Sequence, residues 1–361
     1  MTSFWGNHLK LSVFGESHGR AIGAVIDGLP AGIPIDETAI AKEMDRRASR
    51  GKALATPRKE ADTVNIVSGY FEGHTTGTPL TGMIENTNTR SGDYAGTKDK
   101  MRPGHADYTA WLKYGGYQDY RGGGHFSGRL TAPVVFAGAV AKQVLAAKIE
   151  GLQVGSRILC IGGAADESIV IPEAYADLQY CDANWPVIDE SRIPEMQAAV
   201  SEARADKDSV GGIIEGYVTG VPGGLGSPMF ETVESRLAAL LFAIPAVKGV
   251  EFGSGFAMSG MRGSEANDAF YMDGDRVKTR TNHNGGVNGG ITNGMPLVFR
   301  VAFKPTPSIA QPQATIDMAR REDTTIEIAG RHDPCIVLRA IPAVEAATAL
   351  CLLDLVLEDG R

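Results

Sequence analysis

Short runs of β-branched and apolar residues predict strands on both sides of a polar turn near the start of the chain. The turn is Gly15-Glu16-Ser17-His18-Gly19, and its bracketing glycines suit a functional loop with His18 at the tip. A helix is predicted to follow, because Asp36 can cap a segment that runs to about Arg47 with apolar residues at helical spacing. The strands predicted in this region cover residues 9–14, 21–26, 62–70 and 78–86.

The rest of the chain mixes helical and strand patterns without a steady alternation of the two. A polar, glycine-rich passage from Asn86 to Arg129 has no regular period and is predicted as one long, functional loop. The elements predicted after it are helices over 131–149, 191–207 and 232–244, strands over 153–161, 210–220 and 297–303, and a terminal helix that Pro342 opens. This order favours an α+β fold over a doubly wound parallel sheet.

The composition is that of an ordinary globular protein with one exception. Hydrophobic residues at 43% and charged residues at 22% indicate neither disorder nor a fibrous repeat. No linker or low-complexity segment marks a boundary, so residues 1–361 are predicted to form a single domain. Glycine is the exception, at 45 of 361 residues, or about 12% against a usual level of about 7%. Its doublets and triplets suit places where the backbone approaches a ligand closely.

The charge distribution points to a small anionic ligand. A net charge of −8 argues against a general nucleic-acid binder or a membrane-surface binder, because both present broad basic faces. Locally, however, the segment from Arg46 to Lys59 holds six basic residues and no acidic one. A basic pocket for a small anion explains this segment, and a solvated basic surface is the alternative.

Cysteine usage and the absence of a signal-like segment predict a cytoplasmic protein. Cys160, Cys181, Cys335 and Cys351 show no CxxC spacing, so free thiols in a reducing compartment are expected. The first residues lack an apolar signal core, and the longest apolar segment carries two carboxylates. No membrane span is therefore expected.

Several short motifs bear on the chemistry that the chain can perform. The turn around Ser17 matches the GxSxG pattern of a serine-hydrolase nucleophile, but only fourteen residues precede it, whereas that fold places several strands before its nucleophile. No GxGxxG or GxxxxGK[ST] motif supports a Rossmann or P-loop site. The pair His105 and Asp107 is too short a motif to indicate zinc, and no metal site is expected.

Three histidines stand in similar polar surroundings. His18, His105 and His332 each lie close to glycine or proline and near a carboxylate or an arginine in sequence. One such histidine is more often structural, but three together suit general acid or base catalysis near neutral pH.

Four long segments carry the most specific signal, and in order they span nearly the whole chain. They are FGESHGRAIGAVIDGLPAGI, RPGHADYTAWLKYGGYQDYRGGG, NHNGGVNGGITNGMPLVFRVAFKPTPSI and GRHDPCIVLRAIPAVEAA. Together they resemble the chorismate synthase family. The resemblance implies helices layered between antiparallel sheets, a β-α-β sandwich, and a homotetramer. It also implies a lyase that eliminates phosphate from 5-enolpyruvylshikimate 3-phosphate to give chorismate. The family requires reduced FMN although the reaction has no net redox change, and NADPH is a candidate reductant for that flavin.

The resemblance assigns roles to individual residues. His18 looks like the proton donor to the leaving phosphate, and His105 like the residue that holds the charge state of the reduced flavin at its N1 edge. Asp333 resembles the aspartate that relays the proton taken by flavin N5, with Ser17 and Ser127 as hydroxyl partners.

The family's anionic ligands explain the cations in the matching segments. The substrate carries two carboxylates and a phosphate, and the flavin adds another phosphate, so cations must offset the repulsion between them. The substrate-binding residues implied are Arg47, Arg102, Arg129 and Arg339. The cofactor-binding residues implied are His125, Phe126, Ser127, Gly289, Lys304, Pro305, Thr306, Pro307, Ser308, Arg331 and Arg47.

The chain departs from the family pattern after its glycine triplet. Many members read RSSARET there, whereas this chain reads HFSGRLT from His125 onwards. A non-catalytic protein that binds flavin or a phosphate anion on the same fold is the alternative that this change favours. The hypothesis here is that His125 replaces the arginine as a weaker, pH-dependent contact to phosphate or flavin.

Replacing His125 by arginine tests that hypothesis. His125→Arg is expected to tighten flavin binding and to remove its pH dependence near neutrality, because the guanidinium stays charged. Flavin titrations between pH 6 and 8 measure both effects. An unchanged affinity with an unchanged pH profile would show that His125 does not contact the flavin.

Overall fold

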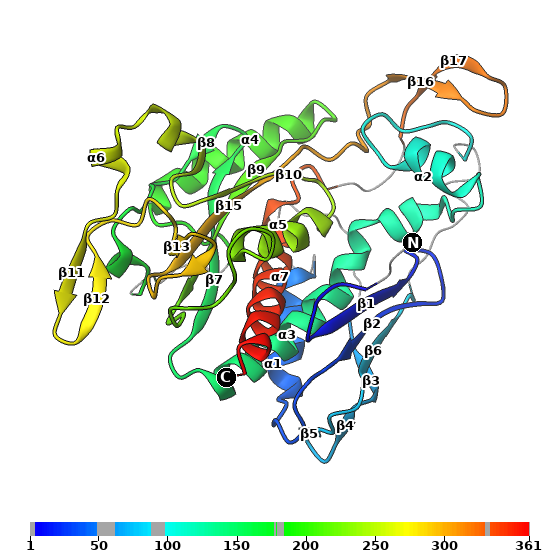
Figure 1. The fold of residues 1–361 in the computed structure, drawn as a ribbon. Helices are drawn as coiled ribbons and strands as arrows, with labels where there is room; N and C mark the ends of the chain where they lie inside the picture. Colours follow the sequence, from blue (N-terminus) through cyan, green and yellow to red (C-terminus); the bar gives the residue numbers. More distant parts are fainter. Residues whose placement is uncertain are drawn as a thin grey trace.

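The computed structural model describes residues 4–48, 62–87, 98–176, 178, 184–328 and 333–360. Two long helices run through its centre, and an antiparallel sheet lies on each side of them (Figure 1). These central helices are α3 (Thr131–Lys148) and α7 (Val337–Glu358), and they pack against each other. The predicted α+β fold, with helices layered between antiparallel sheets, is confirmed.

The first sheet holds the turn that contains His18. Its four strands run in the order β1 (Lys10–Gly15), β2 (Ala21–Asp27), β6 (Leu80–Glu85) and β3 (Asn65–Ser68), all antiparallel. Phe136 of α3 packs on this sheet where Gly82 has no side chain, since a Cβ there would lie 2.3 Å from the phenyl ring. The short apolar runs of the sequence predicted these four strands correctly to within a few residues.

The second sheet covers the other side of the central helices. Its strands run in the order β10 (Val247–Phe252), β15 (Leu297–Phe303), β9 (Gly212–Thr219), β7 (Gln153–Ile161) and β8 (Ala164–Ala165), again antiparallel. Helix α7 contacts β7 and β9. One helix therefore lies against this sheet and against α3, which in turn packs on the first sheet.

The helices follow from local signals as well as from packing. Asp36 caps α1 (Glu37–Arg47), as predicted, by accepting a hydrogen bond from the Thr38 backbone N–H at 2.8 Å. Gly138 lets α3 approach α7 closely, because a Cβ at this position would lie 2.2 Å from that of Ala346. The other helices are α4 (Ile193–Ala205), α5 (Val233–Ala243) and α6 (Gly263–Ala266).

Three parts of the sequence-based prediction were wrong. Helix α7 begins at Val337, five residues before Pro342, because its first turn is buried, with Val337 against Gly212 of β9, and this burial outweighs the loss of the proline amide. The predicted loop 86–129 contains α2 (Asp107–Tyr114), which buries only Ala110 and so has no hydrophobic period. Strand β10 and several hairpins were also missed: β4 (Tyr70–Phe71) with β5 (His74–Thr75), β11 (Phe270–Asp273) with β12 (Arg276–Thr279), β13 (Val287–Asn288) with β14 (Ile291–Thr292), and β16 (Gln313–Asp317) with β17 (Glu322–Ile326).

Two helices of the described chain are long and apolar enough to cross a membrane. They are residues 128–148 and α7, and their most apolar windows are 67% and 94% buried inside the protein. Both pack in the layer between the sheets, so their composition matches that of core helices.

The C-terminal part of α7 holds the first residues of the chain. Asp354, which is fully buried, accepts hydrogen bonds from the backbone N–H groups of Asn7, His8 and Leu9 at 2.7 to 3.2 Å. Arg236 of α5 donates to the same carboxylate. Although burial opposes ionisation, these donors hold the pKa of Asp354 below its usual value.

A buried carboxylate also joins α7 to α1, α3 and β7. Glu345 accepts hydrogen bonds from Arg46 at 2.7 and 2.8 Å, from Lys142 at 2.6 Å and from Ser156 at 2.9 Å. Burial alone raises the pKa of Glu345, but Lys142 and Arg46 outweigh it and lower the pKa from 4.5 to about 2. The carboxylate is thus ionised in the folded protein and neutralised by two cations from different helices.

Removing this charge should destabilise the fold strongly. Glu345→Gln is expected to lower the free energy of unfolding by about 3 to 5 kcal/mol at pH 7, because two buried cations lose their partner. Since the folded-state pKa is depressed, the contribution of Glu345 is complete above pH 4.5 and is lost as the pH falls towards 2. Urea denaturation of both proteins across this range measures the difference.

The matched control is Glu195→Gln, which removes an exposed carboxylate paired with Arg192. It should change the free energy of unfolding by less than about 1 kcal/mol. Equal losses in the two variants would contradict the role assigned to Glu345.

Candidate active site

The turn between β1 and β2 is fixed against a run of glycines from the predicted loop. That run lies in the short helical segment η2 (Arg121–Phe126). The Ser17 backbone N–H donates to the Gly124 carbonyl at 3.0 Å, and His125 Nδ1 donates to the Gly15 carbonyl at 2.8 Å. As a result Ser17 and His18 are each only 5% exposed, so the tip of the turn is buried.

Two consecutive glycines bring the predicted catalytic histidines together. Gly122 has a φ of +60°, and a Cβ built on it would lie 2.2 Å from His18 Nδ1. A Cβ on Gly123, whose φ is +85°, would lie 3.2 Å from His105 Nε2. The backbone of two consecutive glycines therefore contacts both imidazole rings.

His105 belongs to a tight cluster with Arg102 and Asp107. Its Nδ1 lies 2.8 Å from Asp107 Oδ1, and Arg102 donates to both carboxylate oxygens at 2.7 Å. Burial raises the pKa of Asp107, but the hydrogen bonds from Arg102 and His105 outweigh burial and hold the pKa well below its usual value. Asp107 is therefore an ionised acceptor at neutral pH.

The Lys304 to Ser308 run lies against this cluster. Lys304 Nζ donates to the Gly104 carbonyl, and Ser308 Oγ accepts from Arg102 at 3.3 Å. Burial, assisted by the charge of Lys248, lowers the pKa of Lys304. The Thr306 hydroxyl oxygen is buried and has no hydrogen-bond partner among the described residues.

Arg47 and Arg129 share a buried carboxylate that sequence reasoning missed. Both guanidinium groups donate to Asp62, and all three residues are no more than 7% exposed. Burial raises the pKa of Asp62, but the two arginines outweigh burial and lower the pKa. Arg47 also donates to Thr131 Oγ1 at 3.0 Å. No local pattern marks Asp62, because Arg129 lies 67 residues away in sequence.

Asp333 and Arg339 form an ion pair beside Arg47. Arg339 donates to Asp333 Oδ2 at 2.6 Å and to the Arg47 carbonyl at 3.3 Å. Arg331 and His332 lie outside the described residues.

Asn86 connects the buried arginines to the turn that carries His18. Its side-chain amide donates to the carbonyls of Glu16 and Gly19 at 3.0 Å each, and its Oδ1 accepts from Arg129 Nε at 3.3 Å. Ser127 Oγ accepts from the Arg129 backbone N–H at 3.3 Å. Asn86 is thus a further residue that sequence reasoning did not single out.

One predicted residue lies elsewhere in the chain. Gly289 is in the turn between β13 and β14, and Figure 1 shows this hairpin beside the second sheet, far from α2. Within one chain the structure does not bring Gly289 to the histidines.

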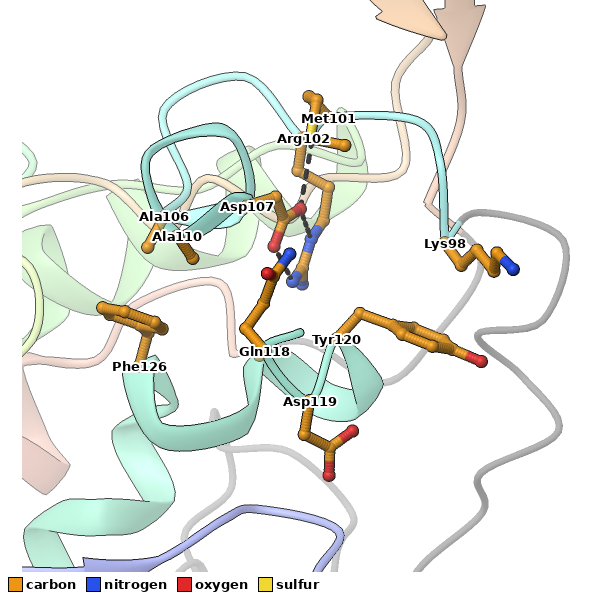
Figure 2. A pocket seen from close by; sticks show the side chains of 11 residues that line it. Lys98, Met101, Arg102, Ala106, Asp107, Ala110, Gln118, Asp119, Tyr120 and Phe126 are labelled. Carbon is orange, nitrogen blue, oxygen red and sulfur yellow. Dashed lines mark hydrogen bonds and ion pairs between the residues drawn. The ribbon is translucent and has the colours of Figure 1, made fainter. Parts of the chain in front are cut away.

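A small hollow, open to solvent, is lined by residues that include Arg102, Asp107 and Gly123, the glycine that faces His105 (Figure 2). Arg102 and Asp107 meet on one side of it, and Tyr120 and the predicted residue Phe126 form other parts of its wall. Neither His18 nor His105 lines it. In the described part of the chain, no group of three or more His, Cys, Asp or Glu side chains is placed to hold a metal ion.

Fold and site together define a class of protein. Two buried or half-buried histidines, next to arginines held by carboxylates in a layered α+β fold, are typical of an enzyme that moves protons on a polyanionic small molecule.

Comparison with known proteins identifies the family within this class. The family model for chorismate synthase matches residues 9–357. Chorismate synthase of Dehalococcoides mccartyi is 45% identical over 360 residues, covering 100% of this chain and 98% of the relative. That of Thermococcus kodakarensis is 48% identical over 351 residues, covering 97% and 96%. A crystal structure of chorismate synthase superimposes with a TM-score of 0.76 at 29% identity, covering 98% of this chain and 93% of the other.

The chain belongs to the chorismate synthase family. It is therefore a lyase, and the alternatives of a non-catalytic anion-binding protein and of a serine hydrolase at Ser17 are not favoured.

Gly122, which lies against the His18 ring, should not tolerate a side chain. Gly122→Ala is expected to lower turnover at least about 100-fold, because its Cβ would overlap the His18 ring and its φ is unfavourable for alanine. Gly128→Ala is the matched control, since a Cβ there meets nothing within 4 Å and no positive φ is required. Steady-state assays with circular dichroism measure activity and folding separately. Full activity in Gly122→Ala would contradict the assigned geometry.

Proposed function

We propose that His18 and His105 are the proton-transfer residues of the chorismate synthase reaction and that the neighbouring arginines hold its substrate. The reaction eliminates phosphate from 5-enolpyruvylshikimate 3-phosphate and gives chorismate. The observation that carries this assignment is the contact of consecutive glycines, Gly122 and Gly123, with the two imidazole rings. Residues 87 positions apart in sequence thereby reach a common site.

His18 is the proton donor to the departing phosphate in this proposal. A phosphate dianion leaves more readily when a positioned acid neutralises its developing charge. Ser17, buried beside His18, is its hydroxyl partner. Asp119 stabilises positive charge on His18, since a hydrogen bond from Arg121 lowers the pKa of Asp119 and keeps this carboxylate ionised. Burial of both residues of the turn keeps water from competing for the proton.

Arg47, Arg129 and Arg339 hold the carboxylates and phosphate of the substrate. Asp62 and Asp333 orient these guanidinium groups and offset part of their charge, leaving a surplus of one positive charge among the five groups. Arg102 contributes a fourth cation from the His105 side. Preorganised guanidinium groups suit carboxylate and phosphate because they donate in pairs.

The cofactor of the proposal is reduced FMN, and the residues around His105 fit it. The buried, unpartnered Thr306 hydroxyl offers a polar contact, and Lys304 offers a cation for an anionic group. The other cofactor contacts proposed are Phe126, His125, Ser127, Pro305, Pro307, Ser308, Arg331, Arg47 and Gly289, the last from outside the cluster. Reduced FMN, when bound, would supply a proton acceptor at N5 without net oxidation, and Asp333 with Ser127 would be the residues that hold and move that proton.

His105 holds the charge state at the N1 edge of the flavin. Its ring is fixed between Asp107 and the Gly123 backbone, so its position does not depend on the ligand. NADPH is the candidate reductant for this flavin.

The assembly proposed is a cytoplasmic homotetramer. Large apolar side chains are exposed on the β11–β12 hairpin and on the segment before it, including Phe256 at 82%, Phe270 at 66% and Met272 at 65%. Exposed apolar groups of this size support burial by a second copy.

The anaerobic reaction with chemically reduced FMN tests the assignment of the histidines. His18→Ala and His105→Ala are each expected to lower chorismate formation and phosphate release by about 100-fold or more, as for loss of a general acid or base. His18→Ala should retain flavin binding, because His18 acts on the substrate.

His74→Ala is the control, since His74 is an exposed histidine on β5. It should keep the rate of the unmodified protein. Flavin binding without turnover in the unmodified protein would overturn the proposed function, and full turnover in His18→Ala would overturn the role of His18.

A further inference from the structure

The Asp107 carboxylate receives more hydrogen bonds than the end of a short helix requires. It is the first residue of α2, and it accepts from Arg102 Nε and a terminal guanidinium nitrogen at 2.7 Å each and from the Arg102 backbone N–H at 3.2 Å. Its Oδ1 also lies 2.8 Å from His105 Nδ1. Figure 2 shows the paired contact of Arg102 with this carboxylate.

We propose that Asp107 is a positioning residue that fixes His105 in one tautomer, with the proton on Nδ1 and with Nε2 as the nitrogen that exchanges protons. This inference rests on the proposed role of His105 in catalysis. Beyond the catalytic role of His105, the inference specifies how its ring is oriented and which nitrogen carries the proton, and it involves only residues of the chain.

The tautomer follows from the chemistry of the carboxylate. His105 Nδ1 lies 2.8 Å from Asp107 Oδ1 and 3.2 Å from a terminal guanidinium nitrogen of Arg102, so the contact with the carboxylate is the shorter one. An ionised carboxylate can only accept hydrogen bonds, and this shorter contact therefore assigns the hydrogen to Nδ1. The contacts of Arg102 keep Asp107 ionised, as its lowered pKa indicates. With Nδ1–H directed to Asp107, the neutral ring has its lone pair on Nε2.

The position of the ring follows from the opposite wall. Nε2 and Cε1 of His105 face Gly123, at 3.2 and 3.1 Å from where a Cβ would stand. Gly122, the preceding residue, faces His18. Nε2 of His105, the nitrogen that exchanges protons, therefore points to the pair of glycines that also contacts His18, the proposed proton donor.

Arg102 prevents the carboxylate from rotating away. It holds both oxygens of Asp107 and is itself tied to the buried Ser308 through a 3.3 Å hydrogen bond. A carboxylate that only stabilised the helix N-terminus would need none of these side-chain contacts. The same logic, in which an aspartate orients a histidine without taking its proton, operates in serine-protease triads.

Nitrogen NMR of the unmodified protein gives the first test. Protein labelled with ¹⁵N-histidine is recorded in mildly alkaline buffer, so that the spectra report on neutral imidazole rings, and the His105 signals are assigned by their absence in His105→Gln. The Nδ1–H form is expected to dominate. A dominant Nε2–H form would overturn the proposal, whether or not any Asp107 variant folds.

Conservative variants give the second test. Asp107→Asn keeps the shape but can turn its amide towards Nδ1, so the Nε2–H form should appear and kcat should fall about 100-fold, with KM for the substrate within about threefold. Asp107→Glu restores the carboxylate and should recover at least about tenfold of that loss. The control is Glu37→Gln, which removes a carboxylate from the first turn of α1 and should change neither measurement.

The outcomes separate this proposal from the one it rests on. Full turnover in His105→Gln would show that His105 is not catalytic. The NMR spectra would still show whether Asp107 fixes the tautomer of the His105 ring. An unchanged tautomer and an unchanged kcat in Asp107→Asn would overturn the positioning role. A loss of kcat that accompanies an unchanged tautomer would do the same, because the effect would then be structural.

Discussion

The proposed active site depends on close approach of the backbone to two imidazole rings. Gly122 and Gly123 both have a positive φ; a Cβ on Gly122 would overlap the His18 ring, and a Cβ on Gly123 would lie tightly against the His105 ring. The next residue, Gly124, accepts the hydrogen bond that fixes the turn of Ser17. A single run of glycines therefore sets the position of residues from the first sheet and of residues from the passage before α2.

Carboxylates that are buried or half-buried organise the cations around this run. Asp62, Asp107 and Asp333 each hold one or two arginines in a fixed direction; Asp62 and its arginines are buried, and the other two pairs are half-buried. In such an environment an unpaired guanidinium group costs several kcal/mol, so an anion-binding pocket needs internal partners before its ligand arrives. The protein can thus be acidic overall while its site is cationic.

The elements that sequence predicted well are those with a local cause. Strands β1 and β2 are short runs rich in apolar and β-branched residues, and Asp36 is a side-chain cap that can be recognised without knowing the fold. Helix α2 was missed because only Ala110 faces inward, and the start of α7 was misplaced because its burial outweighs the local effect of Pro342. These two depend on what surrounds them rather than on their own pattern.

The sequence predicted some residues of the candidate site and missed others. His18 and His105 could be singled out from motifs, and the structure places them against two consecutive glycines. Asp62 and Asn86 could not be singled out, since the contact of each with Arg129 joins residues more than 40 positions apart in sequence. Long-range pairing of this kind leaves no periodic trace in the sequence.

The central place of α7 also has a consequence for how the chain folds. Helix α3 can cover the first sheet early, but α7, which covers the second sheet, is translated after all of its strands, and the backbone amides of residues 7 to 9 gain their acceptor only when Asp354 is in place. Contacts of such sequence separation form late and slowly. The nascent protein therefore carries the second sheet and one side of α3 with uncovered apolar surface until residues 337–358 emerge, a state prone to aggregation that binding by chaperones would protect.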